Sequence, residues 1–122
     1  MTPTVTLGEK LAGYIETALA SPEVRECTRS YCSYIIADQT VRCCAKGLIY
    51  VGEAMERGLT PKGASLERYD YSRYFPDCLN DLAKRINCKP AVFDKIETLH
   101  NYHQVPARKI AQRLRSGEIS VQ

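Results

Sequence analysis

The sequence predicts a mainly α-helical fold, a compact single-domain orthogonal bundle of four to five helices with one short strand allowed near residues 34–37. The chain has 122 residues and is 44% hydrophobic, a size and composition that suit one domain with one core. Apolar residues recur at helical spacing in several segments, which prolines or glycines separate. With 25% charged residues, seven glycines and six prolines, the composition is that of a globular protein. We therefore expect residues 1–122 to form a single helical domain.

The first helix is predicted from Thr6 to about Ala20. Thr6-Leu-Gly-Glu9 is a capping box, in which the threonine and the glutamate satisfy free backbone N–H groups. The apolar positions that follow have helical spacing: Leu7, Leu11, Tyr14, Ile15, Ala18 and Leu19. Pro22 ends the helix because the residue before a proline disfavours helical geometry. The polar segment 24–33 fits a short helical turn, and residues 34–37 fit either a short strand or the approach to the next helix.

The central helix is predicted from about Val41 to Arg57, with Asp38 or Thr40 as its cap. Its apolar stripe consists of Val41, Cys44, Ala45, Leu48, Val51, Gly52 and Met55. Glu53 and Arg57 have the favourable i to i+4 order, and Gly58 supplies a left-handed terminator. Small residues at positions 45, 47, 52 and 54 predict a close helix crossing. The alternative is a shallow cavity for a small ligand, lined by Cys44 and Leu48.

Three further helices are predicted in the C-terminal half, after an ordered loop at residues 59–75. The first is marked by Cys78, Leu79, Leu82, Ala83 and Ile86. Pro90 begins the second, with Val92, Phe93, Ile96 and Leu99 on its apolar face. After a turn at residues 101–104, Pro106 begins the last helix, and Gly117 terminates it. We expect these last two helices to dock on the central helix.

Two stretches of the chain carry a resemblance to known proteins. They are Cys43-Cys44-Ala-Lys-Gly47-Leu-Ile-Tyr-Val-Gly-Glu-Ala54 and Ile96-Glu-Thr-Leu-His100-Asn-Tyr-His-Gln-Val-Pro106-Ala-Arg-Lys-Ile110-Ala-Gln-Arg-Leu114. Together these stretches resemble short uncharacterised bacterial and phage proteins with a Cys-Ala-Leu-Gly-Ala helix and a C-terminal Leu-Asn-Asp-x-His-x-Trp-Ser-Arg-Glu-x-Ile-Ala turn and helix. Here Tyr102 stands at the aspartate, and Val105 and Pro106-Ala-Arg replace the tryptophan and Ser-Arg-Glu. The resemblance implies a helical fold without an assigned activity, and suggests an accessory protein of a phage or mobile element.

Charge and cysteine content limit the classes of partner and the cellular compartment that we expect. The formal net charge of +3 is too small to imply a nucleic-acid or membrane partner by itself. Between Lys84 and Arg115, however, eight residues are basic and two are acidic, so this is the basic end of the chain. No apolar run reaches the roughly 18 to 20 residues of a membrane span, and residues 1–20 do not read as a signal peptide. We expect a cytoplasmic protein without a membrane partner, whose six cysteines are free thiols.

Four residues form a candidate zinc site: Cys78, Cys88, His100 and His103. Imidazole nitrogens and thiolates are the ligands that zinc prefers. Structural zinc usually draws on closely spaced cysteine pairs, whereas a predicted helix separates Cys78 from Cys88. We therefore favour turn histidines and buried thiols, and expect no cofactor.

Cys44 is the candidate catalytic thiol. It lies in the first turns of the predicted central helix, where backbone N–H groups and Arg42 can lower the pKa of its thiol. His100 or His103 could supply the base of a Cys-His pair. The apolar stripe through Cys44 instead favours burial as a small hydrophobe, and Cys43 is expected to face another direction and be more exposed. An enzyme is thus the less favoured reading.

Two surfaces are candidate binding sites. One combines aromatic and cationic side chains at Arg68, Tyr69, Tyr71, Arg73 and Tyr74, residue types enriched at protein interfaces. The simpler alternative is that its aromatic residues anchor the loop to the core. The other is the basic end, with Arg108, Lys109 and Arg113. A helix-turn-helix motif is disfavoured there because the residues after Leu114 are too few for a recognition helix.

The sequence thus predicts a non-enzymatic binding protein with a protein partner. Nucleic-acid binding through the basic C-terminal helices is the first alternative, and a thiol-dependent enzyme or small-ligand binder centred on Cys44 is the second. A homo-oligomer is compatible with either binding surface.

Overall fold

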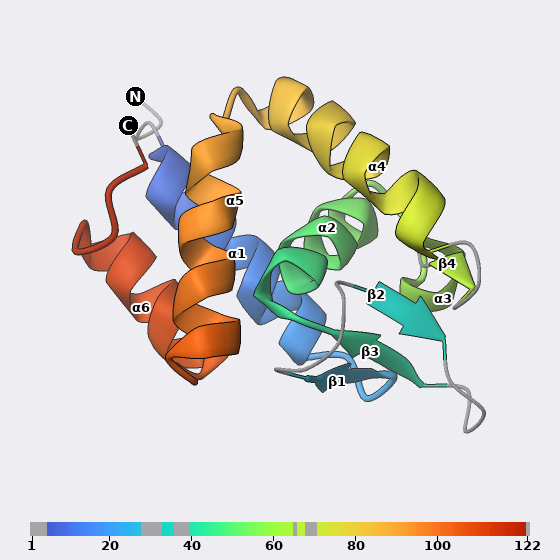
Figure 1. The fold of residues 1–122 in the computed structure, drawn as a ribbon. Coiled ribbons are helices and arrows are strands. Elements are labelled where there is room, and N and C mark those ends of the chain that lie inside the picture. The colour runs from blue at the N-terminus through green and yellow to red at the C-terminus, as the bar shows by residue number, and fades with distance from the viewer. Residues whose placement is uncertain (1–4, 28–32, 36–39, 65, 68–70, 122) are drawn as a thin grey trace.

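The computed structural model describes residues 5–27, 33–35, 40–64, 66–67 and 71–121, with residues 33–35, 66–67 and 71–78 described by their backbone. The helices are α1 (Leu7–Leu19), α2 (Ala45–Glu56), α3 (Pro61–Ala64), α4 (Tyr71–Ile86), α5 (Pro90–Glu97) and α6 (Ala107–Ser116), and a π-helical turn, η1 (Thr98–Tyr102), continues α5. The strands are β1 (Val24–Glu26), β2 (Ser33–Ile35), β3 (Val41–Cys43) and β4 (Leu66–Glu67). The mainly helical fold is confirmed, and Figure 1 shows the strands gathered at one end of the helices.

Helix α1 lies at the centre of the helical part and packs against α2 and α6 (Figure 1). It starts as predicted, with Thr6 as N-cap accepting a hydrogen bond from the backbone N–H of Glu9 at 3.1 Å. Leu11 and Ile15 are fully buried on its inner face. The C-terminal helices do not form a pair docked on one central helix as expected, because α6 packs mainly on α1 while α5 contacts α2.

The predicted central helix begins later than expected. Residues Val41–Cys43 form β3, and Cys44 rather than Asp38 or Thr40 is the N-cap of α2. Val41 and Cys43 face the core from alternate positions of the strand, as the period of two requires. This orientation makes Cys43 fully buried, and the expectation that it would be exposed is wrong.

The four short strands form one sheet in the order β1-β3-β2-β4. β3 pairs in parallel with β1 and antiparallel with β2, while β2 and β4 pair in parallel. The strand predicted near residues 34–37 is therefore present as β2, with residues 36–37 outside the described part. The loop predicted at 59–75 is wrong, because α3, β4 and the start of α4 lie within it. Of the segment 24–33, for which a short helical turn was expected, Val24–Glu26 form β1, and residues 28–32 lie outside the described part.

Helices α1 and α2 cross at very short range through Gly52. A Cβ atom placed on Gly52 would lie 1.9 Å from the carbonyl oxygen of Tyr14, far inside van der Waals contact. This confirms close helix crossing as the reason for a glycine at this position, where helix propensity alone opposes it. The end of α2 is also as predicted, since Gly58 has a φ of 95° and its N–H donates to the Met55 carbonyl oxygen.

An ion-pair cluster joins α2 to α4. The carboxylate of Glu53 is buried, with 6% of the residue exposed. It lies 2.8 Å from Nε of Arg57 and 3.1 Å from Nε of Arg85. The predicted i to i+4 pair is thus present, and Arg85 extends it across the helix interface.

Among the described residues, no helix combines the length and the apolar character needed to cross a membrane.

Candidate functional site

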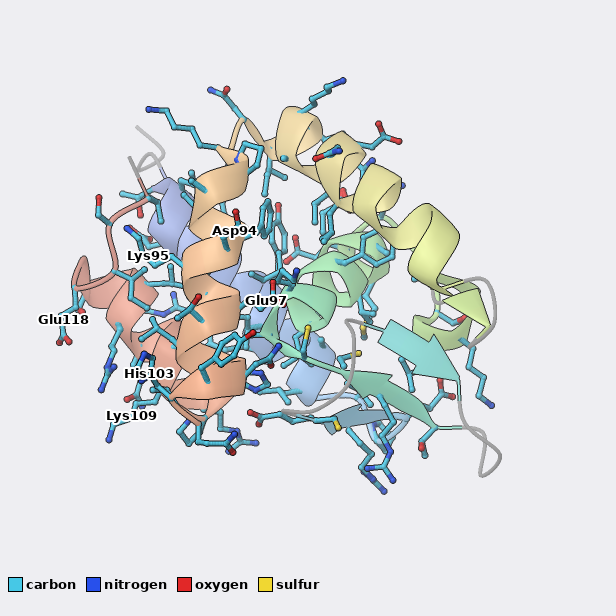
Figure 2. The ribbon with its side chains drawn as sticks, in the orientation of Figure 1. Asp94, Lys95, Glu97, His103, Lys109 and Glu118 are labelled. Atoms are coloured by element: carbon cyan, nitrogen blue, oxygen red, sulfur yellow. The ribbon has the colours of Figure 1, made fainter. Side chains whose placement is uncertain are left out.

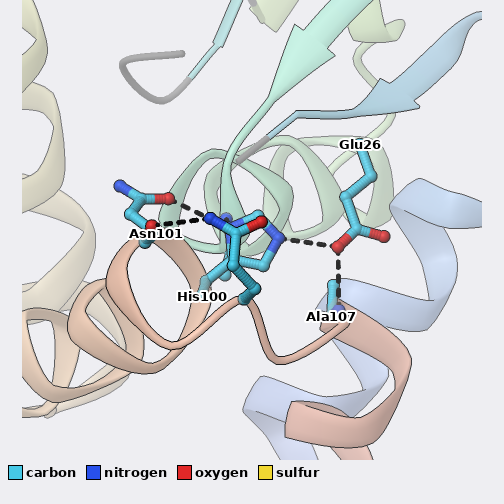
Figure 3. A network of polar contacts seen from close by, with 6 residues as sticks. Glu26, His100, Asn101 and Ala107 are labelled. Atoms are coloured by element: carbon cyan, nitrogen blue, oxygen red, sulfur yellow. Dashed lines mark hydrogen bonds and ion pairs between the residues drawn. The ribbon is translucent and has the colours of Figure 1, made fainter. Parts of the chain in front are cut away.

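A buried polar cluster surrounds His100, which lies in the π-helical turn η1. Its side chain is fully buried, and its Nε2 lies 2.6 Å from Oε2 of Glu26 at the end of β1. The same carboxylate oxygen accepts a hydrogen bond from the backbone N–H of Ala107 at 2.9 Å. Figure 3 shows the imidazole ring between Asn101 and Glu26, with Glu26 reaching the first residue of α6. Glu26 of β1 therefore contacts η1 and the start of α6, which lie 74 and 81 residues away in the sequence.

The other ring nitrogen of His100 faces the start of α2. The backbone N–H of Ala45 donates to Nδ1 at 3.2 Å, and Oδ1 of Asn101 lies 3.2 Å from the same nitrogen. A hydrogen bond accepted from Ala45 requires an Nδ1 without a proton, so the neutral ring carries its hydrogen on Nε2 and donates it to Glu26. A protonated ring would instead donate from Nδ1 to Asn101.

These contacts cap two helices from outside. The N-cap residues of α2 and α6, Cys44 and Pro106, make no side-chain capping hydrogen bond. His100 and Glu26 take the first backbone N–H groups of these helices instead, groups that have no partner within a helix. The cluster therefore has a structural role in fixing where α2 and α6 begin.

The cluster shifts the protonation of both partners. The hydrogen bond with His100 is the largest influence on Glu26 and lowers its pKa, with further lowering by the Ala107 N–H, while burial opposes them. For His100, burial is the largest single influence and lowers the pKa. The hydrogen bonds with Glu26 and Asn101, together with the charges of Glu26 and Cys44, outweigh burial, so the pKa of His100 is raised. The geometry thus favours an ionised Glu26 and a His100 that protonates readily.

The structure brings Cys44 near His100 rather than His103. Cys44 immediately precedes Ala45, whose N–H contacts the imidazole, and its charge contributes to the pKa of His100. His103 ends η1 and is exposed. Glu26 completes a thiol, imidazole and carboxylate set that the sequence did not indicate, because nothing in the polar segment 24–33 distinguishes this glutamate. Cys44 is 1% exposed and His100 is fully buried, whereas the Glu26 side chain is 29% exposed, so solvent reaches the set only at its carboxylate.

The four candidate zinc ligands do not converge where their side chains are described. Both ring nitrogens of His100 are engaged within the polar cluster, and His103 is exposed. Cys88 lies between α4 and α5, where its Sγ contacts the carbonyl oxygen of Lys89 at 3.5 Å and burial raises the pKa of its thiol. The side chain of Cys78 lies outside the described part. Within that part, no three His, Cys, Asp or Glu side chains gather as a metal site.

No disulfide bond involves the cysteines whose side chains are described, which are Cys27, Cys43, Cys44 and Cys88. The aromatic and cationic segment 68–74 is described only in part. Arg68 and Tyr69 lie outside the described residues. The first turn of α4 contains Tyr71, Arg73 and Tyr74, and only its backbone is described.

Helix α6 separates an apolar face from a basic one. Its buried residues are Ala107, Ile110, Ala111 and Leu114. Arg108, Lys109 and Arg115 are exposed and Arg113 is half-buried, and no acidic residue occurs within the helix. Arg115 forms an ion pair with Glu16 of α1. The outer face of α6 therefore presents positive charge together with neutral polar groups.

A hollow of about 550 Å³ lies beside this face, between α5 with η1 on one side and α6 with the chain after it on the other. Its lining residues include Lys95, His103, Arg113 and Glu118. Figure 2 shows that Lys95, His103, Lys109 and Glu118 occupy the same side of the molecule. From the basic end of the chain, this side carries Lys95, Lys109 and Arg113.

Comparisons of the chain with protein-family models, with curated proteins and with solved structures gave no match.

Proposed function

We propose that this protein binds nucleic acid through the basic outer face of α6. The observation that supports the proposal is a helix anchored by its apolar face on α1, whose outer face carries Arg108, Lys109 and Arg113 without an acidic residue in the helix. Phosphate contacts from lysine and arginine supply most of the sequence-independent affinity of nucleic-acid binding.

The geometry of α6 suits contact with a phosphate backbone. Lys109 and Arg113 are four residues apart and share one side of the helix. At about 1.5 Å per residue their Cα atoms are roughly 6 Å apart along the axis, so both side chains can reach phosphates of the same strand. The proposed mode is therefore contact of Lys109 and Arg113 with phosphates.

The test is fluorescence anisotropy with labelled single-stranded and double-stranded DNA at 50 to 200 mM salt. One variant removes three positive charges from α6: Arg108→Gln, Lys109→Gln, Arg113→Gln. The control variant removes three positive charges outside α6: Lys62→Gln, Lys84→Gln, Lys89→Gln. We expect the α6 variant to bind at least tenfold more weakly and to lower the salt slope by about two to three, and the control to retain most affinity. Equal losses in both variants, or no binding by the wild type at 50 mM salt, would contradict the proposal.

A second candidate function is thiol chemistry at Cys44, favoured by the adjacent His100 and its partner Glu26. A carboxylate that orients the imidazole and a thiol at a helix N-terminus are the components of a Cys-His nucleophile. Alkylation with iodoacetamide between pH 5 and 9, followed by peptide mass spectrometry, tests this reading. This function predicts modification of Cys44 at pH 6 that His100→Asn suppresses, and it requires an opening that exposes Cys44, which is 1% exposed in the structure. Modification of Cys44 only after denaturation would leave the cluster its capping role alone.

A protein partner for residues 68–74 remains a separate proposal, and it fits the accessory role that the resemblance to phage proteins suggests. Its test compares the proteins recovered from a lysate with the wild type and with the variant Tyr71→Ala, Arg73→Ala.

Elemental analysis of the purified protein tests whether zinc is bound.

A further inference from the structure

The hollow between α5 and α6 brings together nitrogen-bearing side chains from three separate elements, two of them cationic. Lys95 comes from α5, His103 from the end of η1 and Arg113 from α6. Its volume of about 550 Å³ lies within the range of small-ligand pockets. Ile119, which is buried, and Leu99, which is partly buried, supply an apolar lining. A concave apolar surface with converging cations suits a ligand that has an anionic group and a planar apolar part.

The cations of this hollow keep donor capacity for an anion. Nζ of Lys95 donates one hydrogen bond to the carbonyl oxygen of Ser120 at 3.1 Å, which places the ammonium and leaves it two further N–H groups. Nε of Arg113 lies 3.9 Å from Oε2 of Glu118, whose side chain is 68% exposed. A contact of this length across an exposed carboxylate is weak. An incoming anion can therefore replace Glu118 beside the guanidinium.

We propose that this hollow binds a phosphate monoester that carries a nucleoside, with Lys95, His103 and Arg113 around the phosphate and Leu99 and Ile119 against the nucleoside. The inference rests on the proposed nucleic-acid binding and makes it more specific. Lys109 lies one helical turn before Arg113, so the basic face of α6 continues from the hollow. A strand whose terminal phosphate occupies the hollow would continue along α6, whereas a free mononucleotide would occupy the hollow alone.

The experiment compares three probes by anisotropy or calorimetry. They are an oligonucleotide with one terminal phosphate, placed at its 5′ end or at its 3′ end, the same oligonucleotide without a terminal phosphate, and adenosine monophosphate. Lys95→Gln removes a cation of the hollow that is absent from α6, and Lys109→Gln removes a cation of α6 that does not line the hollow. Both replace surface side chains, and far-UV circular dichroism checks the fold.

We expect the wild type to bind a phosphorylated end about tenfold more tightly than an unphosphorylated one. Lys95→Gln should abolish this preference and leave the unphosphorylated strand unaffected, while Lys109→Gln should weaken both strands equally. Equal binding of the two oligonucleotides by the wild type would overturn the inference and leave the α6 proposal intact. Binding of adenosine monophosphate, lost in Lys95→Gln, without binding of the unphosphorylated strand would keep the hollow and overturn the α6 proposal.

Discussion

Replacement of Gly52 by alanine should destabilise this protein strongly, because backbone atoms surround the position. The new Cβ would lie 1.9 Å from the oxygen and 2.5 Å from the carbon of the Tyr14 carbonyl. Ordinary contact begins at 3.4 Å, so α1 and α2 would have to separate by roughly 1.5 Å. That separation would loosen the buried residues between them, including Leu11 and Leu48.

The expected cost exceeds the gain in helix propensity. Overpacking of a core costs about 1 to 3 kcal/mol and more where backbone must move, while alanine in place of glycine contributes roughly 1 kcal/mol of helix stability. Because backbone must move, we expect the overpacking to cost about 4 kcal/mol and the net loss from Gly52→Ala to be about 3 kcal/mol. This is equivalent to a fall of roughly 12 °C in the melting temperature of a chain of this size. Urea and thermal denaturation followed by circular dichroism measure both quantities.

Gly13 in α1 is the matched control for this substitution. It is one residue from Tyr14, and a Cβ placed on it meets nothing within 4 Å. Gly13→Ala should therefore stabilise the protein by about 0.5 to 1 kcal/mol. A Gly52→Ala protein that is as stable as the wild type would refute the close crossing of α1 and α2.

Three further predictions concern individual polar contacts. The difference in unfolding free energy between the wild type and Glu26→Gln should be largest between about pH 4.5 and 6.5, the ordinary pKa values of the two partners. Because the pKa of His100 is raised, its contribution to the free energy of unfolding is complete below pH 6.5 and is lost as the pH rises through the raised pKa. Because the pKa of Glu26 is lowered, its contribution is lost as the pH falls through the lowered pKa. Urea titrations at several pH values measure this difference, and a constant difference from pH 4 to 9 would argue against the ion pair. Glu53→Gln should cost about 1 to 2 kcal/mol, since two partly exposed arginines lose their shared carboxylate; a cost below 0.5 kcal/mol in the same assay would assign the cluster no net stabilisation. Thr6→Ala should cost about 1 kcal/mol through loss of the α1 cap, and a Thr6→Ser variant with the same loss would show that the hydroxyl is not the cause.

The helices were largely predictable because their signals are local. The capping box at Thr6, the proline at the start of α5 and the glycine after α6 each act within a few residues, and each lies at the expected boundary. Strands of two or three residues are too short to show a period, so β1 and β4 gave no recognisable pattern. The apolar spacing of Val41 also fits a helix, and only its pairing with β1 and β2 shows that it belongs to a strand.

The polar cluster was predictable only in part. The possible pairing of Cys44 with a histidine follows from residue chemistry, but the choice between His100 and His103 depends on η1. In this π-helical turn His100 faces inward while His103 is left exposed. Glu26 could not be identified, because its partners lie 74 and 81 residues away in sequence. Contacts of such separation depend on the tertiary arrangement that places the end of β1 beside η1 and the start of α6.

The buried cluster and the basic face of α6 are physically connected through Glu26. Its carboxylate accepts the N–H of Ala107, the first residue of α6, while His100 holds the same carboxylate from the other side. A negative group at a helix N-terminus complements the helix dipole, and the basic residues Arg113 and Arg115 complement the opposite end. Glu26 at its start and the apolar face against α1 hold α6 in place, and Arg108 and Lys109 are left exposed on the outer side. Loss of Glu26 should loosen the start of α6, so the stability of this ion pair and the geometry of the proposed binding surface depend on the same carboxylate.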